Sequence, residues 1–243
     1  MPSALLLGAT GQVGQSVLKE LLASSHFTRV GEYGRRVTKP DVIVTGKDKL
    51  EQKTIDFEKI DQAGLKDGKW DVVFVTLGTT KKQAGSAEAF EKIDREYVLN
   101  AARAALTGDP NHSQRVVYVS SVGANHSSSF LYPRSKGLTE IGLAKLGYND
   151  TIIFRPSMLK GANRAEPRIA ETIWGAITGV AAHFSNNMEI QISTLAKSVV
   201  KAGIVGSSAL PKSANAKTEA LEGVKFTLID NAGAMNIAKE GAA

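Results

Sequence analysis

The sequence predicts an α/β protein with a doubly wound parallel sheet in a single domain. Two observations predict it: short apolar runs alternate with helical patterns, and the first run leads through a glycine-rich turn into a helix. The length of 243 residues fits one such domain. With 42% hydrophobic and 22% charged residues, the composition is that of a globular chain and excludes wholesale disorder. Together these features describe a Rossmann-type domain over residues 1–243.

Short β-rich runs mark the predicted strands. They lie at Ala4–Leu7, Arg29–Tyr33, Val42–Thr45, Asp71–Thr76, Arg115–Ser120, Thr151–Phe154 and Lys225–Ile229. The runs Val72–Val75 and Val116–Val119 are apolar throughout, as expected of strands that helices cover on both faces. The sequence therefore favours a parallel sheet.

Apolar residues at helical spacing mark the helices between these strands. One stripe consists of Val13, Val17, Leu18, Leu21 and Leu22. A second consists of Phe90, Ile93, Tyr97, Ala101 and Ala105. Further helices are predicted over Tyr132–Leu146, Ile169–Phe184 and Leu195–Val205. The stretch Ser207–Glu219 contains Pro211 and lacks a period, so we predict a surface loop there.

The composition limits the chemistry. The chain has no cysteine, which excludes disulfides, thiolate catalysis and a cysteine-based zinc site. The histidines show no metal-ligand spacing, so we expect no metal; they are His26, His112, His126 and His183. The formal net charge of +6 is spread along the chain apart from the pairs Arg35-Arg36 and Lys81-Lys82. We therefore expect no nucleic-acid partner.

No membrane span is expected either. The most extended apolar stretch, Ile173–Ala182, has about half of the roughly 20 residues that a spanning helix needs. Its Gly175 and Gly179 form a GxxxG spacing, which we interpret as a packed core helix, with a dimer or membrane contact as the alternative. The chain starts Met1-Pro2-Ser3 and enters the first strand without a presequence, so we expect a cytoplasmic protein.

A phosphate-binding turn is predicted at Gly8-Ala9-Thr10-Gly11-Gln12-Val13-Gly14, between the first strand and the first helix. Glycine permits positive φ and lets backbone N–H groups approach a pyrophosphate closely. The helix N-terminus adds oriented donors and a partial positive charge. The residues expected to bind a dinucleotide are Gly8, Thr10, Gly11, Gln12, Val13 and Gly14. The alternative is that these glycines serve the turn alone.

The residues after the second strand indicate whether a protein of this fold binds NAD(H) or NADP(H). NAD-binding proteins of this fold place an acidic residue there, which accepts a hydrogen bond from the ribose 2′-hydroxyl. This chain has Gly34-Arg35-Arg36, and guanidinium groups bind a 2′-phosphate in a bidentate manner. Glu32 lies close by, but strand alternation turns it away from Arg35. NADP(H) is therefore the predicted cofactor, and a solvated arginine pair is the alternative.

A second motif points to proton transfer. Tyr132 and Lys136 stand four residues apart in a predicted helix, and hence on one helix face. A phenol is a poor acid or base at neutral pH, and an ammonium beside it stabilises the phenolate. Ser120 and Ser121 end the preceding strand, at the edge where parallel sheets bind ligands. We expect Ser121, one step beyond the strand, to face the site, and ordinary surface roles for these residues are the alternative.

These residues resemble the short-chain dehydrogenase/reductase superfamily, whose members share the glycine turn and the Ser…Tyr-x-x-x-Lys set. Further runs narrow the resemblance to the atypical branch with the HIV Tat-interacting protein and the fungal Fmp-type mitochondrial outer-membrane proteins. Those runs are Asp56-Phe57-Glu58-Lys59, Leu77-Gly78-Thr79-Thr80, Ile93-Asp94-Arg95-Glu96-Tyr97-Val98, Ser120-Ser121-Val122-Gly123-Ala124, Phe130-Leu131-Tyr132 and Arg155-Pro156-Ser157. The resemblance covers nearly the whole chain and is weakest in the C-terminal third.

The resemblance implies a site for NADPH and a set of residues that hold it. Besides the glycine turn and the arginine pair, the implied contacts are Asp56, Phe57, Leu77, Gly78, Thr79, Tyr132, Lys136, Arg155, Pro156 and Ser157. Asp56 and Phe57 lie at the adenine in this comparison, and the loop 155–157 lies at the nicotinamide. The resemblance also implies that residues 157–222 shape the substrate pocket. A peripheral location at the mitochondrial outer membrane is compatible with the sequence.

The leading hypothesis is an NADPH-dependent carbonyl reductase or alcohol dehydrogenase that acts on a small apolar molecule. Tyr132 is the general acid/base, Lys136 anchors the ribose and stabilises the phenolate, and Ser121 orients the substrate oxygen. The alternative is a non-catalytic regulator or scaffold in which NADPH orders the fold for a protein partner. A third hypothesis, a nucleic-acid binder, predicts salt-sensitive affinity for DNA or RNA.

Overall fold

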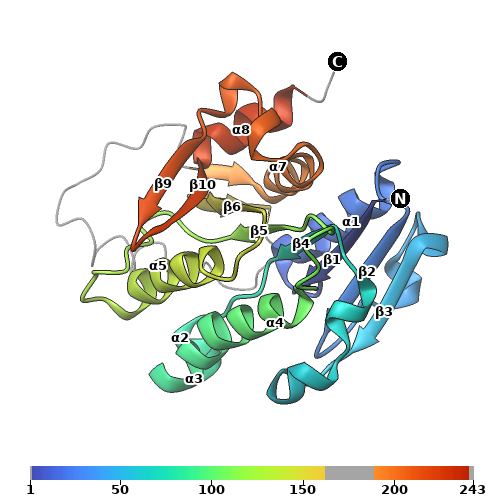
Figure 1. Ribbon diagram of the computed structural model, residues 1–243, viewed down its shortest axis with the longest axis horizontal. Coiled ribbons are helices and arrows are strands. Elements are labelled where there is room, and N and C mark those ends of the chain that lie inside the picture. The colour runs from blue at the N-terminus through green and yellow to red at the C-terminus, as the bar shows by residue number, and fades with distance from the viewer. Residues whose placement is uncertain (1, 162–188, 241–243) are drawn as a thin grey trace.

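The computed structural model describes residues 2–161 and 189–240. They form one domain built on a single large sheet, with helices on both sides of it (Figure 1). The predicted helix Ile169–Phe184 and its glycine pair lie outside the described residues, as does part of the expected pocket region 157–222.

An eight-stranded sheet runs through the domain in the order β3-β2-β1-β4-β5-β6-β10-β9. Neighbouring strands are parallel except β9, which pairs antiparallel with β10. The strands are β1 (Ser3–Leu7), β2 (Arg29–Gly34), β3 (Leu50–Thr54), β4 (Val72–Val75), β5 (Arg115–Val119), β6 (Asp150–Arg155), β9 (Lys217–Leu221) and β10 (Val224–Asp230), with a separate parallel pair β7 (Met158–Lys160) and β8 (Glu189–Gln191). The chain order reverses between β1 and β4, where doubly wound sheets bind ligands at their carboxyl edge. The predicted fold class is confirmed.

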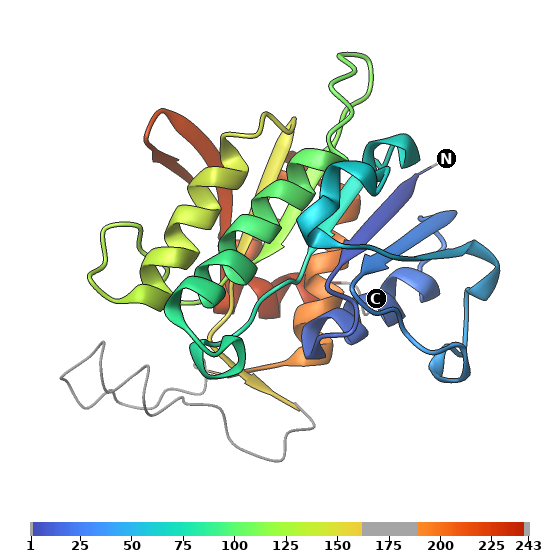
Figure 2. The ribbon, with the colours of Figure 1, turned by 90° about the horizontal axis from the view of Figure 1, so that it is seen from below.

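Helices cover both faces of this sheet. They are α1 (Gln12–Ala23), α2 (Lys81–Ala84), α3 (Ala87–Glu91), α4 (Tyr97–Ala105), α5 (Leu131–Ala144), α7 (Ile192–Val205) and α8 (Asn231–Lys239). On one face, α1, α7 and α8 share a core with Leu6. On the other, α4 and α5 lie side by side (Figure 2) and share a core with Leu5 and Leu7. Successive side chains of β1 thus enter opposite cores, which explains why its run is apolar throughout.

Short helical turns connect these elements. They are the 3-10 helices η1 (Pro40–Val42), η2 (Lys47–Lys49), η3 (Phe57–Gln62), η4 (Leu65–Gly68), η7 (Ser207–Ala209) and η8 (Lys212–Ala214), and the π-helix η5 (Lys92–Glu96). The second predicted stripe, from Phe90 to Ala105, is helical throughout, but it comprises α3, η5 and α4 in succession. The π-helix is the part of this stretch that bears on the site below.

The strand predicted at Val42–Thr45 is wrong. Pro40 begins the turn η1, and the valines after it face solvent, Val42 with 62% and Val44 with 89% of its surface exposed. The third strand is instead β3, a largely polar run. It lies at the edge of the sheet, where a strand needs no continuous apolar pattern. An apolar triplet was therefore a poorer guide than position in the sheet.

The loop predicted over Ser207–Glu219 is wrong at its C-terminal end, because β9 begins at Lys217. β9 is an edge strand whose first two residues are exposed, so its sequence lacks an apolar alternation. The sequence also did not indicate β7, β8 or α8. The other predicted strands, together with α1, α5 and α7, are confirmed, with boundaries that differ by a few residues.

Candidate cofactor and catalytic site

The glycine turn after β1 leaves no room for a Cβ at Gly8 or Gly14. Gly8 has a φ of +97°, and a Cβ there would lie 2.8 Å from the backbone nitrogen of Leu77. A Cβ on Gly14 would lie 2.0 Å from the carbonyl oxygen of Gly8. These contacts bring β1, α1 and the end of β4 together. Gly11 stands at the N-cap of α1 and has no side chain to cap it, so the first-turn N–H groups suit an anion.

Arg35 and Arg36 follow directly after β2, at the same carboxyl edge of the sheet. Both side chains are exposed, and neither makes a hydrogen bond or ion pair with another described residue. Glu32, within β2, is fully buried and accepts hydrogen bonds from Thr38 and Gln52. The strand therefore separates the carboxylate from the arginines, as the alternation predicted.

Asp56 and Phe57, the residues implied at the adenine, differ in exposure. Asp56 is exposed at the end of β3 and accepts a hydrogen bond from the backbone of Glu58 at 3.0 Å. Phe57 is buried, with its ring stacked on Tyr97 at 5.2 Å between centroids. The ring of Phe57 therefore belongs to the core beneath α4, which leaves its backbone and Asp56 for contact with a base.

The turn Leu77-Gly78-Thr79 after β4 lies against a buried charged pair. The backbone N–H of Thr79 donates to Asp94 Oδ1 at 3.3 Å. A Cβ on Gly78 would lie 3.4 Å from that oxygen and 3.6 Å from Lys136 Nζ. The backbone of this turn therefore lies in contact with the pair.

Lys136 is buried within a network of three groups. Its Nζ lies 3.0 Å from Asp94 Oδ1 and donates to the hydroxyl of Tyr118 at 2.9 Å. The Nζ also lies 5.9 Å from the ring centroid of Tyr132. Burial alone would lower the pKa of Lys136, but the charge of Asp94 outweighs it and holds this pKa well above the ordinary lysine value. Lys136 is thus an ammonium at neutral pH, next to Tyr132.

Asp94 is the site residue that sequence reasoning missed. It is fully buried in the π-helix η5, and its second oxygen, Oδ2, has no hydrogen-bond partner among the described residues. The sequence did contain a signal for it. Asp94 falls four residues after Phe90 and three before Tyr97, so helical spacing puts its carboxylate on the same face as an otherwise apolar stripe. A carboxylate on the buried face of a helix is costly unless a cation pairs with it, and here that cation is Lys136.

The structure distinguishes the two serines after β5. Ser120 is buried, and its hydroxyl donates to Glu140 Oε1 at 2.5 Å. Ser121 is half-buried, and its hydroxyl lies 3.2 Å from the carbonyl of the next residue. Ser120 is therefore engaged within the buried fold, while the Ser121 hydroxyl donates to an exposed carbonyl, that of Val122. Tyr132, in the first turn of α5, makes no hydroxyl hydrogen bond with a described residue.

The loop 155–157 after β6 is fixed from three sides. The guanidinium of Arg155 binds Glu140 through two hydrogen bonds of 2.9 and 2.5 Å. The carbonyl of Pro156 accepts from Val122, and the backbone N–H of Ser157 donates to the side chain of Asn231, both at 2.9 Å. Arg155 therefore acts within the protein, and the loop offers its backbone and Ser157 to a cofactor.

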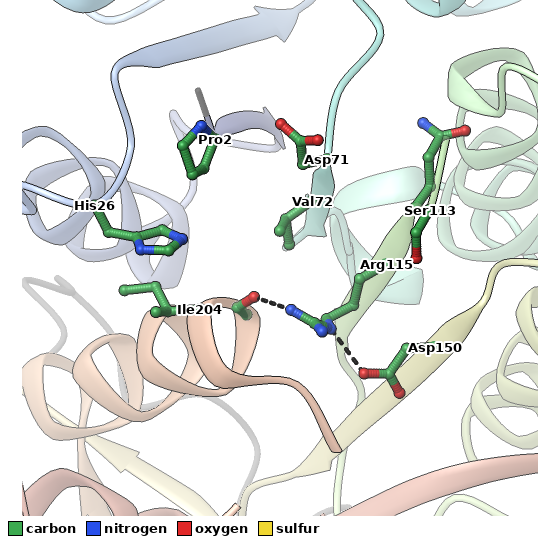
Figure 3. A pocket seen from close by; sticks show the side chains of 10 residues that line it. Pro2, His26, Asp71, Val72, Ser113, Arg115, Asp150 and Ile204 are labelled. Carbon is green, nitrogen blue, oxygen red and sulfur yellow. Dashed lines mark hydrogen bonds and ion pairs between the residues drawn. The ribbon is translucent and has the colours of Figure 1, made fainter. Parts of the chain in front are cut away.

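A pocket at the opposite, amino-terminal edge of the sheet is separate from this site (Figure 3). Its charged lining groups are used within the fold. Arg115 lies 2.7 Å from Asp150 and donates to the carbonyl of Gly203, and Asp71 accepts from the backbone and hydroxyl of Ser3. The pocket therefore adds no group to the site at the glycine turn.

Over residues 2–161 and 189–240, no cluster of three or more His, Asp or Glu side chains is placed to hold a metal ion. Within the same ranges, no helix combines the length and the apolar character that crossing a bilayer requires.

A glycine turn at the switch point of a doubly wound sheet, followed by a Tyr/Lys pair on α5, defines an NAD(P)-binding protein of the short-chain dehydrogenase/reductase type. A family model described as NAD(P)H-binding matches residues 8–167. The chain belongs to this family and, within it, to the atypical branch that contains HTATIP2 and the Fmp52 proteins. The predicted resemblance is confirmed.

Two relatives illustrate this membership. The chain is 38% identical over 169 residues to Protein HTATIP2 of Rattus norvegicus, covering 70% of this chain and 67% of the relative. It is 30% identical over 219 residues to Protein fmp52, mitochondrial, of Aspergillus niger, covering 84% of this chain and 88% of the relative.

Solved structures support the fold. A short chain dehydrogenase/reductase of Saccharomyces cerevisiae, YIR035C, has a TM-score of 0.64 at 14% identity, with 95% of this chain and 96% of that chain covered. The enzyme WbmF of Bordetella bronchiseptica, in complex with NAD+, has a TM-score of 0.60 at 14% identity, with 98% and 77% covered. The likeness shows a shared architecture.

Proposed function

We propose that the protein is an NADPH-dependent oxidoreductase of the carbonyl reductase or alcohol dehydrogenase type, acting on a small apolar molecule. One observation carries the proposal: Lys136, buried and ion-paired with Asp94, lies beside the Tyr132 ring at the carboxyl edge of the sheet. That edge also carries the glycine turn. A phenol, an ammonium and a dinucleotide cradle together suit proton transfer coupled to hydride transfer.

The residues present fit a dinucleotide. The approach of Gly14 to Gly8 leaves the turn open to a pyrophosphate, and the uncapped start of α1 offers its N–H groups. Arg35 and Arg36 would hold the 2′-phosphate of NADP(H), because their guanidinium groups have no described partner. When bound, the cofactor supplies or accepts the hydride.

Side chains of the protein then transfer the proton and orient the substrate oxygen. Tyr132 transfers the proton at the substrate oxygen, and Lys136 places a positive charge 5.9 Å from the centroid of its ring. Ser121 donates a hydrogen bond to the same oxygen and orients it, since the neighbouring Ser120 is bound to Glu140. The backbone of Pro156 and Ser157 closes the site beside the β5 loop.

Replacing Tyr132 by phenylalanine tests the proposal. We expect turnover of a carbonyl panel, followed by NADPH absorbance, to fall about 10²- to 10⁴-fold because the proton donor is lost. The dissociation constant of NADPH should stay nearly unchanged. Tyr148→Phe is the matched control, because that hydroxyl is buried elsewhere and donates to the carbonyl of Ala102. Turnover that survives Tyr132→Phe would show the assignment to be wrong.

One observation favours a second function, a non-catalytic NADPH-binding regulator. The charge of Lys136 is already balanced by Asp94, which weakens its effect on Tyr132. A regulator needs only the dinucleotide cradle. It predicts that NADPH raises the melting temperature of the protein while no carbonyl or alcohol in the panel is turned over, and that Tyr132→Phe preserves cellular function.

The location of the protein is a separate proposal. The Fmp52 relatives carry the word mitochondrial in their names. From this likeness we propose a cytoplasmic protein with peripheral attachment to the mitochondrial outer membrane. Release from isolated mitochondria by alkaline carbonate, together with sensitivity to added protease on intact mitochondria, would support it. Protection from protease would contradict it.

A further inference from the structure

Glu32 is a fully buried carboxylate close to the arginine pair, and the catalytic scheme does not use it. Its Oε1 accepts hydrogen bonds from the backbone N–H and the hydroxyl of Thr38, both at 2.7 Å. Its Oε2 accepts from the side-chain amide of Gln52, also at 2.7 Å. Both carboxylate oxygens are thus engaged by hydrogen bonds from within the protein.

These bonds close the loop that carries the arginines. Glu32 and Gln52 are register partners on the neighbouring strands β2 and β3. The same Gln52 amide that binds Glu32 also donates to the carbonyl of Thr38 at 2.7 Å. Thr38 is therefore held through its N–H, its hydroxyl and its carbonyl. The segment between β2 and Thr38 becomes a short closed loop.

The arginines stand at the tip of this loop. Gly34 begins it so tightly that a Cβ there would lie 3.1 Å from the carbonyl oxygen of Arg36. The side chains of Arg35 and Arg36 are exposed and have no hydrogen bond to a described residue, so the loop backbone alone positions them. A loop held at both ends loses less entropy when it binds a phosphate.

We infer that Glu32 is a positioning residue that selects NADP(H) over NAD(H), by fixing the loop that presents Arg35 and Arg36 to the 2′-phosphate. This inference rests on the cofactor in the proposed function. It reverses the usual role of an acidic residue near the end of β2, which binds the ribose hydroxyls and repels a 2′-phosphate. Here the carboxylate supports binding of the phosphate.

The two roles predict opposite signs, which makes them separable. If Glu32 repelled the phosphate, Glu32→Gln would strengthen NADPH binding. If Glu32 holds the loop, Glu32→Gln weakens NADPH binding. The carboxamide presents an N–H₂ group to the N–H₂ group of Gln52, and two donors cannot form the hydrogen bond that fixes the loop. Thr38→Val leaves the charge of Glu32 in place and removes only a loop contact, so it isolates the geometric effect.

The test is calorimetric titration of the wild type, Glu32→Gln and Thr38→Val with NADPH and with NADH. We expect Glu32→Gln to weaken NADPH binding about tenfold and Thr38→Val to weaken it about threefold. Decreases of this size correspond to the loss of one or two hydrogen bonds. NADH affinity should change less than about twofold, because NADH does not need the loop. Unchanged NADH binding also shows that the variants fold.

Other outcomes separate the two proposals. Tighter NADPH binding by Glu32→Gln, or equal loss of both cofactors, would overturn the role of Glu32 while leaving the proposed function intact. A wild type that prefers NADH would overturn the proposed cofactor and this role with it. The wild-type titration alone decides that point, before any variant is measured.

Discussion

At the glycine turn, the groups placed to meet a cofactor are backbone N–H groups and two exposed arginines, whereas at α5 they are side chains buried against one another. The first region depends on conformation, because Gly8 and Gly14 allow an approach that a Cβ would block. The second depends on charge, because Asp94 holds the pKa of the buried Lys136 well above the ordinary lysine value. Damage to the first should therefore affect binding, and damage to the second should affect stability and turnover.

The comparison predicts the largest effect for Asp94→Asn. This variant leaves the ammonium of Lys136 buried without a counter-charge, which costs about 3–5 kcal/mol of unfolding free energy at neutral pH. Urea denaturation monitored by circular dichroism measures it. In the double variant Asp94→Asn, Lys136→Met, much of the loss should return, because no charge is then buried. A single variant as stable as the wild type would contradict the buried pair.

The same pair predicts the sign of a pH dependence. In the wild type, the pKa of Lys136 is raised by Asp94, so the pair stabilises the fold below the ordinary lysine pKa, and this stabilisation is lost as pH rises through the folded value. In Asp94→Asn, burial lowers the pKa instead. The deficit of the variant should therefore shrink as pH rises, first because folding of the variant no longer buries a charged lysine, and then, above the ordinary lysine pKa, because the wild type loses its own stabilisation. A deficit that grows with pH would be inconsistent with this cause.

Gly14→Ala should have the next largest effect. The added Cβ would lie 2.0 Å from the carbonyl oxygen of Gly8, so the turn must shift. We expect a loss of about 1–3 kcal/mol in stability, the usual cost of overpacking, and loss of the thermal stabilisation by NADPH. Lys19→Ala, on the exposed side of α1, is the control that should change neither. Retained NADPH stabilisation in Gly14→Ala would place the pyrophosphate elsewhere.

We expect the smallest change in free energy for the double variant Arg35→Ala, Arg36→Ala. Removing the exposed pair should weaken NADPH binding about tenfold, leave NADH binding unchanged and leave the melting temperature as it was. The double variant Lys212→Ala, Lys225→Ala removes the same charge from the part of the chain around β9 and β10, at the far edge of the sheet. Equal losses in the two double variants would mean that net charge, and not the loop, attracts the phosphate.

The sequence predicted the glycine turn well because strand, turn and helix are adjacent in the chain. It predicted the shared helix face of Tyr132 and Lys136 for the same reason, since four residues of α-helix set the spacing. It was misled at Val42–Thr45, where only Ile43 reaches the core. A local apolar pattern predicts burial correctly only where the tertiary structure packs another element against that segment.

What the sequence by itself determined is the Rossmann-type sheet, the glycine turn between its first strand and first helix, and the family, all of which rest on short-range patterns. The tertiary structure decided which serine is engaged, because Glu140 reaches Ser120 from α5. It also decided that Gln52 binds the buried Glu32 and that Asp94 holds Lys136. Those contacts join segments distant in the chain, and their partners are chosen by packing and by the need to satisfy buried polar groups. Periodicity along the sequence can place Glu32 and Asp94 on a buried face, but it does not identify their partners.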